Sequence, residues 1–329
     1  MKVLVTGANG FIGSSLVRYL SGNGYSVRGL IRAQADLKFL EGLDCDLLYA
    51  DITNTENLEA ATKGMDIVIH TAGLSSDWGD WNDFIQTNVE GTINMVSASA
   101  RCGVKRFVHL SSVAVHWFGS VNGKEDGPTP LSHMAYAESK KQAEQWLTTF
   151  ASGSAMEIVI VRPGNVYGPH DEKFIGPYLD FIKQKKFSYI NGGRRLTCPT
   201  YIENLMVGIE LACLSEKACN ETFIITDGLM INWRAFTEGL LMKTGIPLPK
   251  RSVPFSAAYF TAYCLEMIYK LSGSRTPPLL TRYRVNNAGR NYHFSIEKAK
   301  TLLGYQPRVD FDTAVTRTID WYTKQQRSF

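Results

Sequence analysis

The sequence predicts an α/β fold in which a parallel, doubly wound sheet is joined to a smaller C-terminal part. Three observations lead to this prediction. Short apolar runs rich in β-branched residues alternate with segments of helical spacing through the first half of the chain. A glycine-rich turn follows the first of these runs. The chain has 329 residues, which is long enough for a full sheet-and-helix core and a second, smaller unit.

Strands are expected where apolar residues form a continuous run, as they do in buried parallel sheets. The predicted strands are 2–6, 26–31, 46–50, 66–71, 106–111 and 157–162, with a late strand at 223–226 that returns to the sheet. Helices are predicted between them, among them 14–20, 85–101 and 135–151.

Turns that contain proline, at 163–169 and 247–254, mark the expected crossings into the smaller part. The predicted sheet domain therefore covers 1–165 with a returning segment near 195–227, and the smaller part covers 166–194 and 228–329. This part is expected at the carboxyl edge of the sheet, where ligands bind in such folds.

The turn after the first strand has the order strand, glycine turn, helix that a dinucleotide-binding loop requires. Gly7 permits a tight turn, Gly10 lets the backbone approach a pyrophosphate, and Gly13 lets the helix pack close to the sheet. The helix N-terminus then offers N–H groups to the phosphates, although an ordinary turn can also hold three glycines. The residues expected to contact the cofactor here are Gly7, Asn9, Gly10, Phe11, Ile12 and Gly13.

The end of the second strand bears on the choice of dinucleotide. It lacks the carboxylate that binds the ribose 2′-OH in NAD sites, and it places Arg32 there instead. Arg32 could accept a 2′-phosphate through a charge-assisted contact or lie in solvent, and we expect NADP(H) to be favoured over NAD(H). Asp51 and Ile52 are candidates for the adenine side, while Asp51 is equally suited to capping the turn before Asn54.

Tyr136 and Lys140 carry the predicted chemistry. They stand at positions i and i+4 of a predicted helix and therefore share one face. A tyrosine with its usual pKa near 10 is a poor base, and a nearby ammonium is expected to lower that pKa. Tyr136 can then exchange a proton with an alcohol or ketone, while Lys140 tunes it and holds the ribose of the cofactor. A surface pair is the ordinary alternative for two such residues.

Three further groups are candidates around this pair. Ser112, next to Ser111 at the end of the fifth strand, could orient the substrate oxygen or simply end the strand. Asn88 could hold a water that relays protons to Lys140, or serve packing. Thr71-Ala72-Gly73 closes the fourth strand with small residues that let the backbone approach the cofactor.

Composition excludes several classes of protein. The net charge is only +4 with basic residues scattered along the chain, so nothing indicates nucleic-acid binding. The six cysteines and six histidines are dispersed, which predicts reduced thiols in a cytoplasmic protein and no metal site. Met1-Lys2 runs directly into the first strand, so no signal peptide is expected, and no stretch is long enough to span a bilayer as a helix.

Taken together, these motifs resemble the extended short-chain dehydrogenase/reductase family. The matching segments are TGANGFIG, Asp51, HTAG at 70–73, NVEGT at 88–92, Ser111-Ser112-Val113, YAESK at 136–140 and Arg162-Pro163-Gly164 through Pro169. The resemblance implies a Rossmann-type fold, a catalytic triad of Ser112, Tyr136 and Lys140 supported by Asn88, and a cofactor contact at Pro163. It also implies a homodimer.

The C-terminal half is similar to 3β-hydroxysteroid and sterol-4-carboxylate 3-dehydrogenases, through PTYIENL at 199–205 and the stretch from Leu280 to Pro307. Arg32 departs from the acidic residue of the NAD-dependent steroid members, and His116-Trp117 departs from the Tyr-Gly of sugar-nucleotide members. Dihydroflavonol reductases and β-ketoacid reductases share much of this pattern.

The substrate side is rich in aromatic residues. Segment 253–271 is apolar on nearly all faces, so we expect a buried helix, with a substrate channel or a peripheral membrane contact as alternatives. The expected substrate contacts are Ser75, Trp78, Trp117, Asn165 and Tyr167. Basic residues that a sugar nucleotide would need are also present, at Lys173, Arg194, Arg195, Arg282 and Arg290.

The sequence therefore predicts an NAD(P)-dependent oxidoreductase that interconverts an apolar secondary alcohol and ketone, similar to 3β-hydroxysteroid dehydrogenases. The alternatives are a sugar-nucleotide epimerase or dehydratase, and a dihydroflavonol- or β-ketoacid-reductase-like enzyme.

Overall fold

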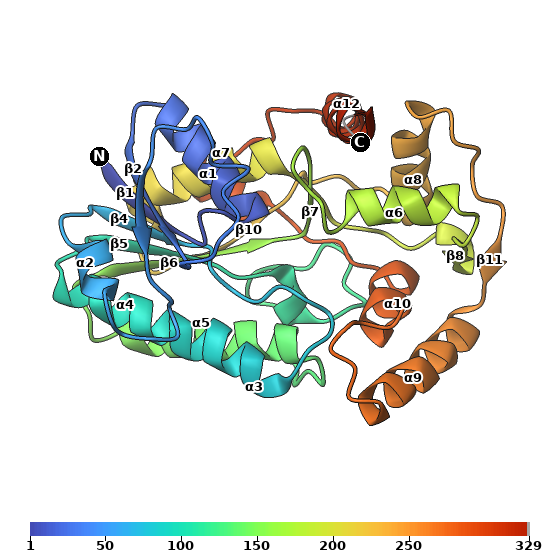
Figure 1. Ribbon diagram of the computed structural model, residues 1–329, viewed down its shortest axis with the longest axis horizontal. Helices are drawn as coiled ribbons and strands as arrows, with labels where there is room; N and C mark the ends of the chain where they lie inside the picture. The colour runs from blue at the N-terminus through green and yellow to red at the C-terminus, as the bar shows by residue number, and fades with distance from the viewer. Residues whose placement is uncertain (328–329) are drawn as a thin grey trace.

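A seven-stranded sheet forms the centre of the computed structural model, which describes residues 1–327 (Figure 1). In sheet order the strands are β10 (Thr222–Ile225), β6 (Glu157–Pro163), β5 (Arg106–Leu110), β4 (Ile67–His70), β1 (Lys2–Thr6), β2 (Ser26–Ile31) and β3 (Asp46–Tyr49). Every neighbouring pair is parallel. The doubly wound parallel sheet and its seven predicted strands are confirmed, and the strand order reverses between β1 and β4.

Helices cover both faces of the sheet (Figure 1). α1 (Phe11–Gly22) and α7 (Ile202–Leu214) pack on one face, in a core that includes Leu16 and Leu205. α2 (Leu58–Thr62), α4 (Gly91–Arg101) and α5 (Ala135–Ala151) pack on the other, around Met95 and Leu147. Because both faces are covered, the strands are apolar along their whole length, which is why their positions could be predicted.

The helix before β5 differs from its prediction. Helix 85–101 was expected, but helical structure begins with α3 (Trp81–Phe84) and passes through a π-helical turn, η1 (Ile85–Glu90), into α4. Inserted π-turns are rare and frequent at functional sites. The buried Asn88 lies in this turn.

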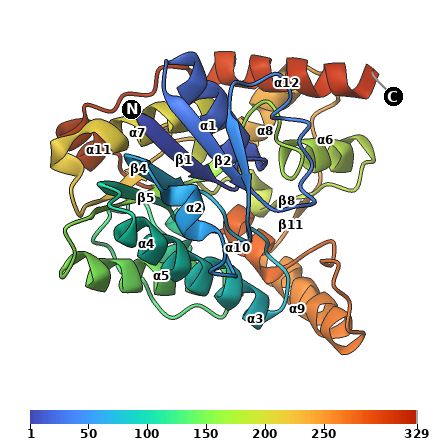
Figure 2. The same ribbon diagram turned by 60° about the vertical axis from the view of Figure 1, so that its left-hand side comes forward.

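The smaller part is built from α6 (Ile175–Lys183), α8 (Trp233–Met242), α9 (Phe255–Leu271) and α10 (Arg282–Gly289), beside the carboxyl edge of the sheet (Figure 2). Two small parallel pairs accompany these helices: β7 (Asn165–Tyr167) with β9 (Pro199–Tyr201), next to the end of β6, and β8 (Tyr189–Ile190) with β11 (Ser252–Val253), within the smaller part. Segment 163–169, expected as a turn, therefore contains a short strand. Three 3-10 turns, η2 (Val113–His116), η3 (Asn191–Gly193) and η4 (Glu216–Ala218), complete the connections.

The last two helices return towards the sheet domain. α11 (Glu297–Leu303) contacts β10 and α7, and α12 (Phe311–Arg327) packs along α8. The C-terminal segment thus contributes to both parts of the molecule. Among residues 1–327, no helix combines the length and apolarity needed to cross a membrane.

The turn between β1 and α1 is held by backbone packing that only glycine permits. Gly7 adopts a φ of +64°, and a Cβ there would lie 2.9 Å from the Cα of Ala72. A Cβ on Gly13 would lie 2.1 Å from the carbonyl oxygen of Gly7. The helix can therefore begin directly against the turn only because both positions lack a side chain.

We expect Gly13→Ala to lower the free energy of unfolding by about 2–3 kcal/mol, because the backbone of the Gly7 turn has to move away from the new methyl group. Gly22→Ala, on the same helix, is the control, since no atom lies within 4 Å of a Cβ there. This variant should be neutral or more stable by about 0.5–1 kcal/mol. Urea denaturation of the two variants tests the difference, and equal stabilities would contradict it.

Candidate active site

The glycine turn forms a cradle of the kind that binds a pyrophosphate. Gly10 is exposed, and the only protein atom that its Cβ would approach is the carbonyl oxygen of Gly7, at 3.3 Å. No side chain caps the N-terminus of α1. The N–H groups of its first turn thus face the carboxyl edge of the sheet without a side-chain acceptor, where an anion is stabilised. Asn9, Phe11 and Ile12 lie in the same turn, and these residues fit the expected dinucleotide.

Arg32 and Asp51 lie at the ends of β2 and β3, as predicted. Arg32 is exposed, and no carboxylate among residues 1–327 forms an ion pair with it. Asp51 accepts hydrogen bonds on Oδ1 from the Thr53 amide, at 2.9 Å, and from the Thr53 hydroxyl, at 2.8 Å. These bonds support the turn-capping interpretation of Asp51. Ile52 is buried under α4, where a Cβ on Gly91 would lie 2.7 Å from its Cδ1.

The small residues after β4 bring the backbone close to the glycine turn. The Thr71 hydroxyl donates to the Thr6 carbonyl at 2.6 Å, and the Ala72 amide donates to the Thr6 hydroxyl at 3.1 Å. A Cβ on Gly73 would lie 3.1 Å from Asn88 Oδ1 and 3.3 Å from Lys140 Nζ. The segment therefore connects the cofactor cradle to the predicted catalytic groups.

Tyr136 lies in the first turn of α5 and is half-buried, and its phenol is hydrogen-bonded to two serine side chains. Burial raises the pKa of Tyr136 above its usual value, and the hydrogen bonds from Ser112 and Ser75 oppose this shift. The expected lowering of the Tyr136 pKa by Lys140 is not found, because burial outweighs the other effects and the lysine is directed elsewhere. Ser112 also caps η2, accepting from the Ala114 amide at 3.1 Å.

Lys140 is buried one turn further along α5. Its Nζ donates to the Leu110 carbonyl at the end of β5, at 2.8 Å. Burial lowers the pKa of Lys140 to about 8, and the Glu144 carboxylate opposes the shift. The ammonium is thus held at the carboxyl edge of the sheet, between the end of β5 and the Gly73 backbone.

Two buried histidines lie beside Lys140, and the sequence analysis did not select them. His70 and His109 face one another across β4 and β5, with ring centroids 5.6 Å apart. Burial, and then the charge of Lys140, lowers the pKa of His70 to about 3 and that of His109 well below its usual value. His70 is hydrogen-bonded to Thr6 and Thr92, while neither ring nitrogen of His109 has a partner in the described chain. Their position at the strand ends was the only signal in the sequence.

Asn88 clamps the loop after β4. Its Oδ1 accepts from the Leu74 amide at 2.7 Å, and its Nδ2 donates to the Leu74 carbonyl at 3.1 Å and to the Ser139 hydroxyl at 2.9 Å. These bonds occupy both ends of the amide, so the structure favours a positioning role for Asn88 over a water relay. The residue after Leu74 is Ser75, which this clamp places beside Tyr136.

A buried ion pair fixes α5 against the sheet. Arg162, in β6, binds Glu144 through two hydrogen bonds, Nε to Oε1 at 2.9 Å and Nη2 to Oε2 at 2.6 Å. Arg162 Nη1 also donates to His116 Nε2 at 2.8 Å. Burial, and then the charge of Arg162, lowers the pKa of His116 to about 4, so this ring is neutral and can accept. The arginine of the RPG motif therefore holds the helix that carries Tyr136 and Lys140. Pro163 follows it at the end of β6.

A cluster of aromatic side chains lies near the Tyr136 phenol. Phe118 packs against Tyr283 and Tyr292, with centroids 5.3 and 4.8 Å away, and Trp117 packs against Phe118. Burial raises the pKa of Tyr283 and of Tyr292, and the nearby Tyr136 adds to both shifts. Tyr283 and Tyr292 thus lie close to the candidate proton donor.

The structure places the other predicted substrate contacts differently. Tyr167 is fully buried against Tyr201 and Phe236, so its position supports core packing. Asn165 exchanges hydrogen bonds with Asn287, at 3.3 and 3.2 Å.

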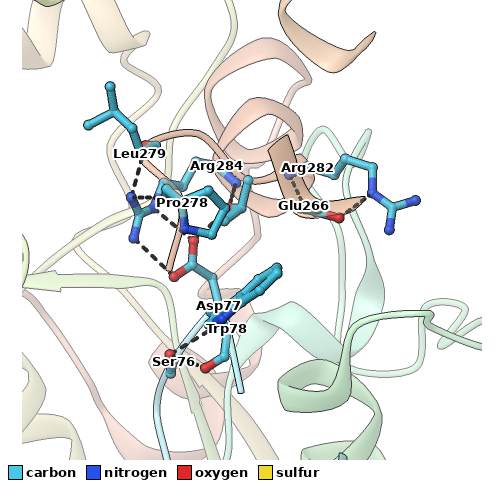
Figure 3. A network of polar contacts seen from close by, with 9 residues as sticks. Ser76, Asp77, Trp78, Glu266, Pro278, Leu279, Arg282 and Arg284 are labelled. Carbon is cyan, nitrogen blue, oxygen red and sulfur yellow. Dashed lines mark hydrogen bonds and ion pairs between the residues drawn. The ribbon is translucent and has the colours of Figure 1, made fainter. Parts of the chain in front are cut away.

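The loop that holds Ser75 is fastened to the α9–α10 region (Figure 3). The Trp78 indole donates to the Ser274 carbonyl at 3.1 Å, and Asp77 accepts from Thr281 at 2.6 Å. Arg284 Nε lies 2.7 Å from the same carboxylate oxygen, Asp77 Oδ2. Movement of α9 and α10 would therefore also displace the loop that holds Ser75 beside Tyr136.

The parallel sheet and the glycine cradle together define a Rossmann-type, dinucleotide-binding enzyme fold. The model of the NAD dependent epimerase/dehydratase family matches residues 3–212, and the chain belongs to this family. The expected family resemblance is thereby confirmed.

Two characterised relatives and one solved structure are similar over nearly the whole chain. The 4-hydroxy-2-methyl-3-oxo-4-farnesyl-3,4-dihydroquinoline-1-oxide ketoreductase of Stigmatella aurantiaca is 32% identical, covering 94% of this chain and 93% of the relative. The 3-beta-hydroxysteroid dehydrogenase of Mycolicibacterium neoaurum is 29% identical, covering 98% and 91%. The crystal structure of gox2253 has a TM-score of 0.83 at 28% identity, covering 99% and 98%.

Lys140→Met is expected to raise the free energy of unfolding at pH 7 by about 1–3 kcal/mol, because the native state no longer buries a cation. The folded pKa of about 8 lies below the unfolded value of 10.5. Wild-type stability should therefore rise with pH between these two values, where only the unfolded lysine still binds its proton. The advantage of the variant should shrink over the same window. Urea unfolding from pH 7 to 10.5 measures it, and a constant difference would show that Lys140 is not desolvated.

Proposed function

We propose that this protein is an NAD(P)-dependent oxidoreductase that interconverts an apolar secondary alcohol and its ketone. The observation that carries the proposal is the Tyr136 phenol, which is hydrogen-bonded to Ser112 and Ser75 and lies close to the buried aromatic side chains of Tyr283 and Tyr292. A proton donor in such surroundings suits a carbonyl or carbinol on an apolar skeleton.

The residues have separate roles in this chemistry. Ser112 and Ser75 hold the substrate oxygen near the phenol, and Tyr136 gives that oxygen a proton in reduction or takes one in oxidation. Lys140 holds a positive charge beside the glycine cradle, where a ribose hydroxyl can accept from it. A nicotinamide dinucleotide, when bound, supplies or accepts the hydride.

The charges of the smaller part support an apolar substrate over a sugar nucleotide. Arg282 is bound to Glu266 through its Nε, at 2.7 Å, and Arg290 lies over the Phe255 ring and donates to Asn286. Two of the five basic residues considered for a diphosphate are thus engaged in packing. The names of the two relatives, a ketoreductase and a hydroxysteroid dehydrogenase, agree with this substrate class. A homodimer stays a prediction.

Tyr136→Phe should lower kcat about 10²–10⁴-fold, which is the usual contribution of a general acid or base, while cofactor binding persists. Tyr283→Phe is the control, because it removes a neighbouring buried hydroxyl without touching the proton donor. Steady-state reduction of a steroid ketone, with cofactor binding followed by fluorescence, measures both effects. Retention of full activity by Tyr136→Phe would exclude the mechanism. Turnover of a UDP-sugar, and of no ketone, would move the protein to the epimerases.

We also propose that the cofactor is NADP(H), with Arg32 binding the 2′-phosphate, because Arg32 is exposed beside the cradle and no carboxylate takes its place. Arg32→Ala should weaken NADPH binding about tenfold or more and leave NADH binding unchanged, since one charge-assisted contact is lost. Arg101→Ala, at the end of α4, is the control. If Arg32→Ala lowers the affinity for NADPH and for NADH equally in a fluorescence titration, Arg32 attracts both cofactors by its charge and does not bind the 2′-phosphate. A wild-type protein that prefers NADH would refute the proposal.

A further inference from the structure

α9 presents an apolar face to solvent, which corrects the expectation that segment 253–271 is buried. Only Ala258, Ala262 and Glu266 of this helix are buried, and they face α10 and Val285. The opposite side carries large apolar residues, with Phe260 68% and Leu271 84% exposed. The full set of exposed apolar residues here is Phe260, Tyr263, Met267, Ile268, Leu271 and, in the following loop, Leu279. They recur at helical spacing and form one stripe, which we call the α9 stripe.

The exposed charges of the segment that carries the α9 stripe have one sign. Between Pro249 and Thr281 the only acidic residue is Glu266, which is buried and bound to the Arg282 amide and guanidinium. Lys270 and Arg275 are exposed beside the stripe, and no ion pair of the described chain neutralises them. The stripe is therefore apolar along its centre and cationic at its end.

We propose that the α9 stripe docks on the surface of an anionic lipid bilayer. An apolar helical face that carries aromatic residues and is flanked by cations is what such a surface binds: the apolar side chains enter the headgroup boundary and the cations meet anionic lipids. A twofold contact between copies of this chain is less well matched, because each stripe would meet a second cationic face with no exposed acid from this segment.

The position of the α9 stripe gives the docking a consequence for the reaction. Ser274, in the turn after α9, accepts the indole N–H of Trp78, and Thr281 donates to Asp77. Figure 3 shows the ion pair of Asp77 with Arg284. Ser75, which hydrogen-bonds to Tyr136, lies two residues before Asp77. A bilayer that holds α9 thus lies next to the loop beside the site, so an apolar substrate dissolved in the bilayer would have a short path to it. This last step rests on the proposed function, whereas the docking does not.

The experiment is vesicle flotation of the full-length protein without substrate. Vesicles of phosphatidylcholine with phosphatidylglycerol should bind the wild type, and binding should weaken with added salt and with phosphatidylcholine alone. Ile268→Glu/Leu271→Glu should reduce binding at least about tenfold, because two inserted side chains become anionic. Leu214→Glu/Met242→Glu is the matched control, with equally exposed apolar residues on α7 and α8, and should bind like the wild type.

Three outcomes would overturn the docking. The wild type does not bind anionic vesicles, both double variants bind equally, or light scattering shows a wild-type dimer that Ile268→Glu/Leu271→Glu converts to a monomer. Circular dichroism and cofactor titration verify that the variants are folded. Since flotation needs no turnover, it separates failure of the docking from failure of the proposed reaction.

Discussion

The structure depends on the burial of one ammonium group. Lys140 is placed where β5 ends, and the Leu110 carbonyl is the one hydrogen-bond acceptor that the described chain gives its Nζ. His70 and His109 beside it are neutral, and Gly73 adjoins it without a side chain. A buried cation without a direct counterion is costly, and it attracts electron-rich groups to the same place. A ribose hydroxyl and a phenol oxygen are groups of that kind.

The ion pair between Arg162 and Glu144 makes this burial possible. It ties α5 to β6 by two hydrogen bonds within the core, one helical turn after Lys140. The Glu144 carboxylate also raises the pKa of Lys140 against the effect of burial. The Arg162–Glu144 ion pair thus fixes the position of α5, and its carboxylate also affects the pKa of Lys140. The backbone of the glycine turn contributes the remaining side of the site, since Gly7 touches Ala72 and Gly73 adjoins Lys140.

Much of this arrangement could be predicted from the sequence, because a parallel sheet covered on both faces requires continuous apolar strands. All seven strands, the glycine turn and α5 follow from such local patterns. Tertiary contacts decided the rest. The π-turn around Asn88 arises from the bonds of Asn88 to Leu74 and Ser139, which sequence spacing does not encode. The face that α9 exposes depends on its contact with α10, and the pKa of Tyr136 depends on burial.

Several energetically costly features lie in the part of the molecule that holds Tyr136. Trp117 adopts a φ of +67°, in the left-handed region that favours glycine, although its side chain is a large indole that packs against Phe118. His109 is buried without a partner, Lys140 is buried as a cation, and Asn88 lies in a π-turn. Each feature costs free energy that a simpler residue at the same position would not. Such costs persist in a folded chain when the surrounding packing over-determines them, and they concentrate where function requires the geometry. The costly features near Tyr136 therefore agree with the site that the motifs indicate.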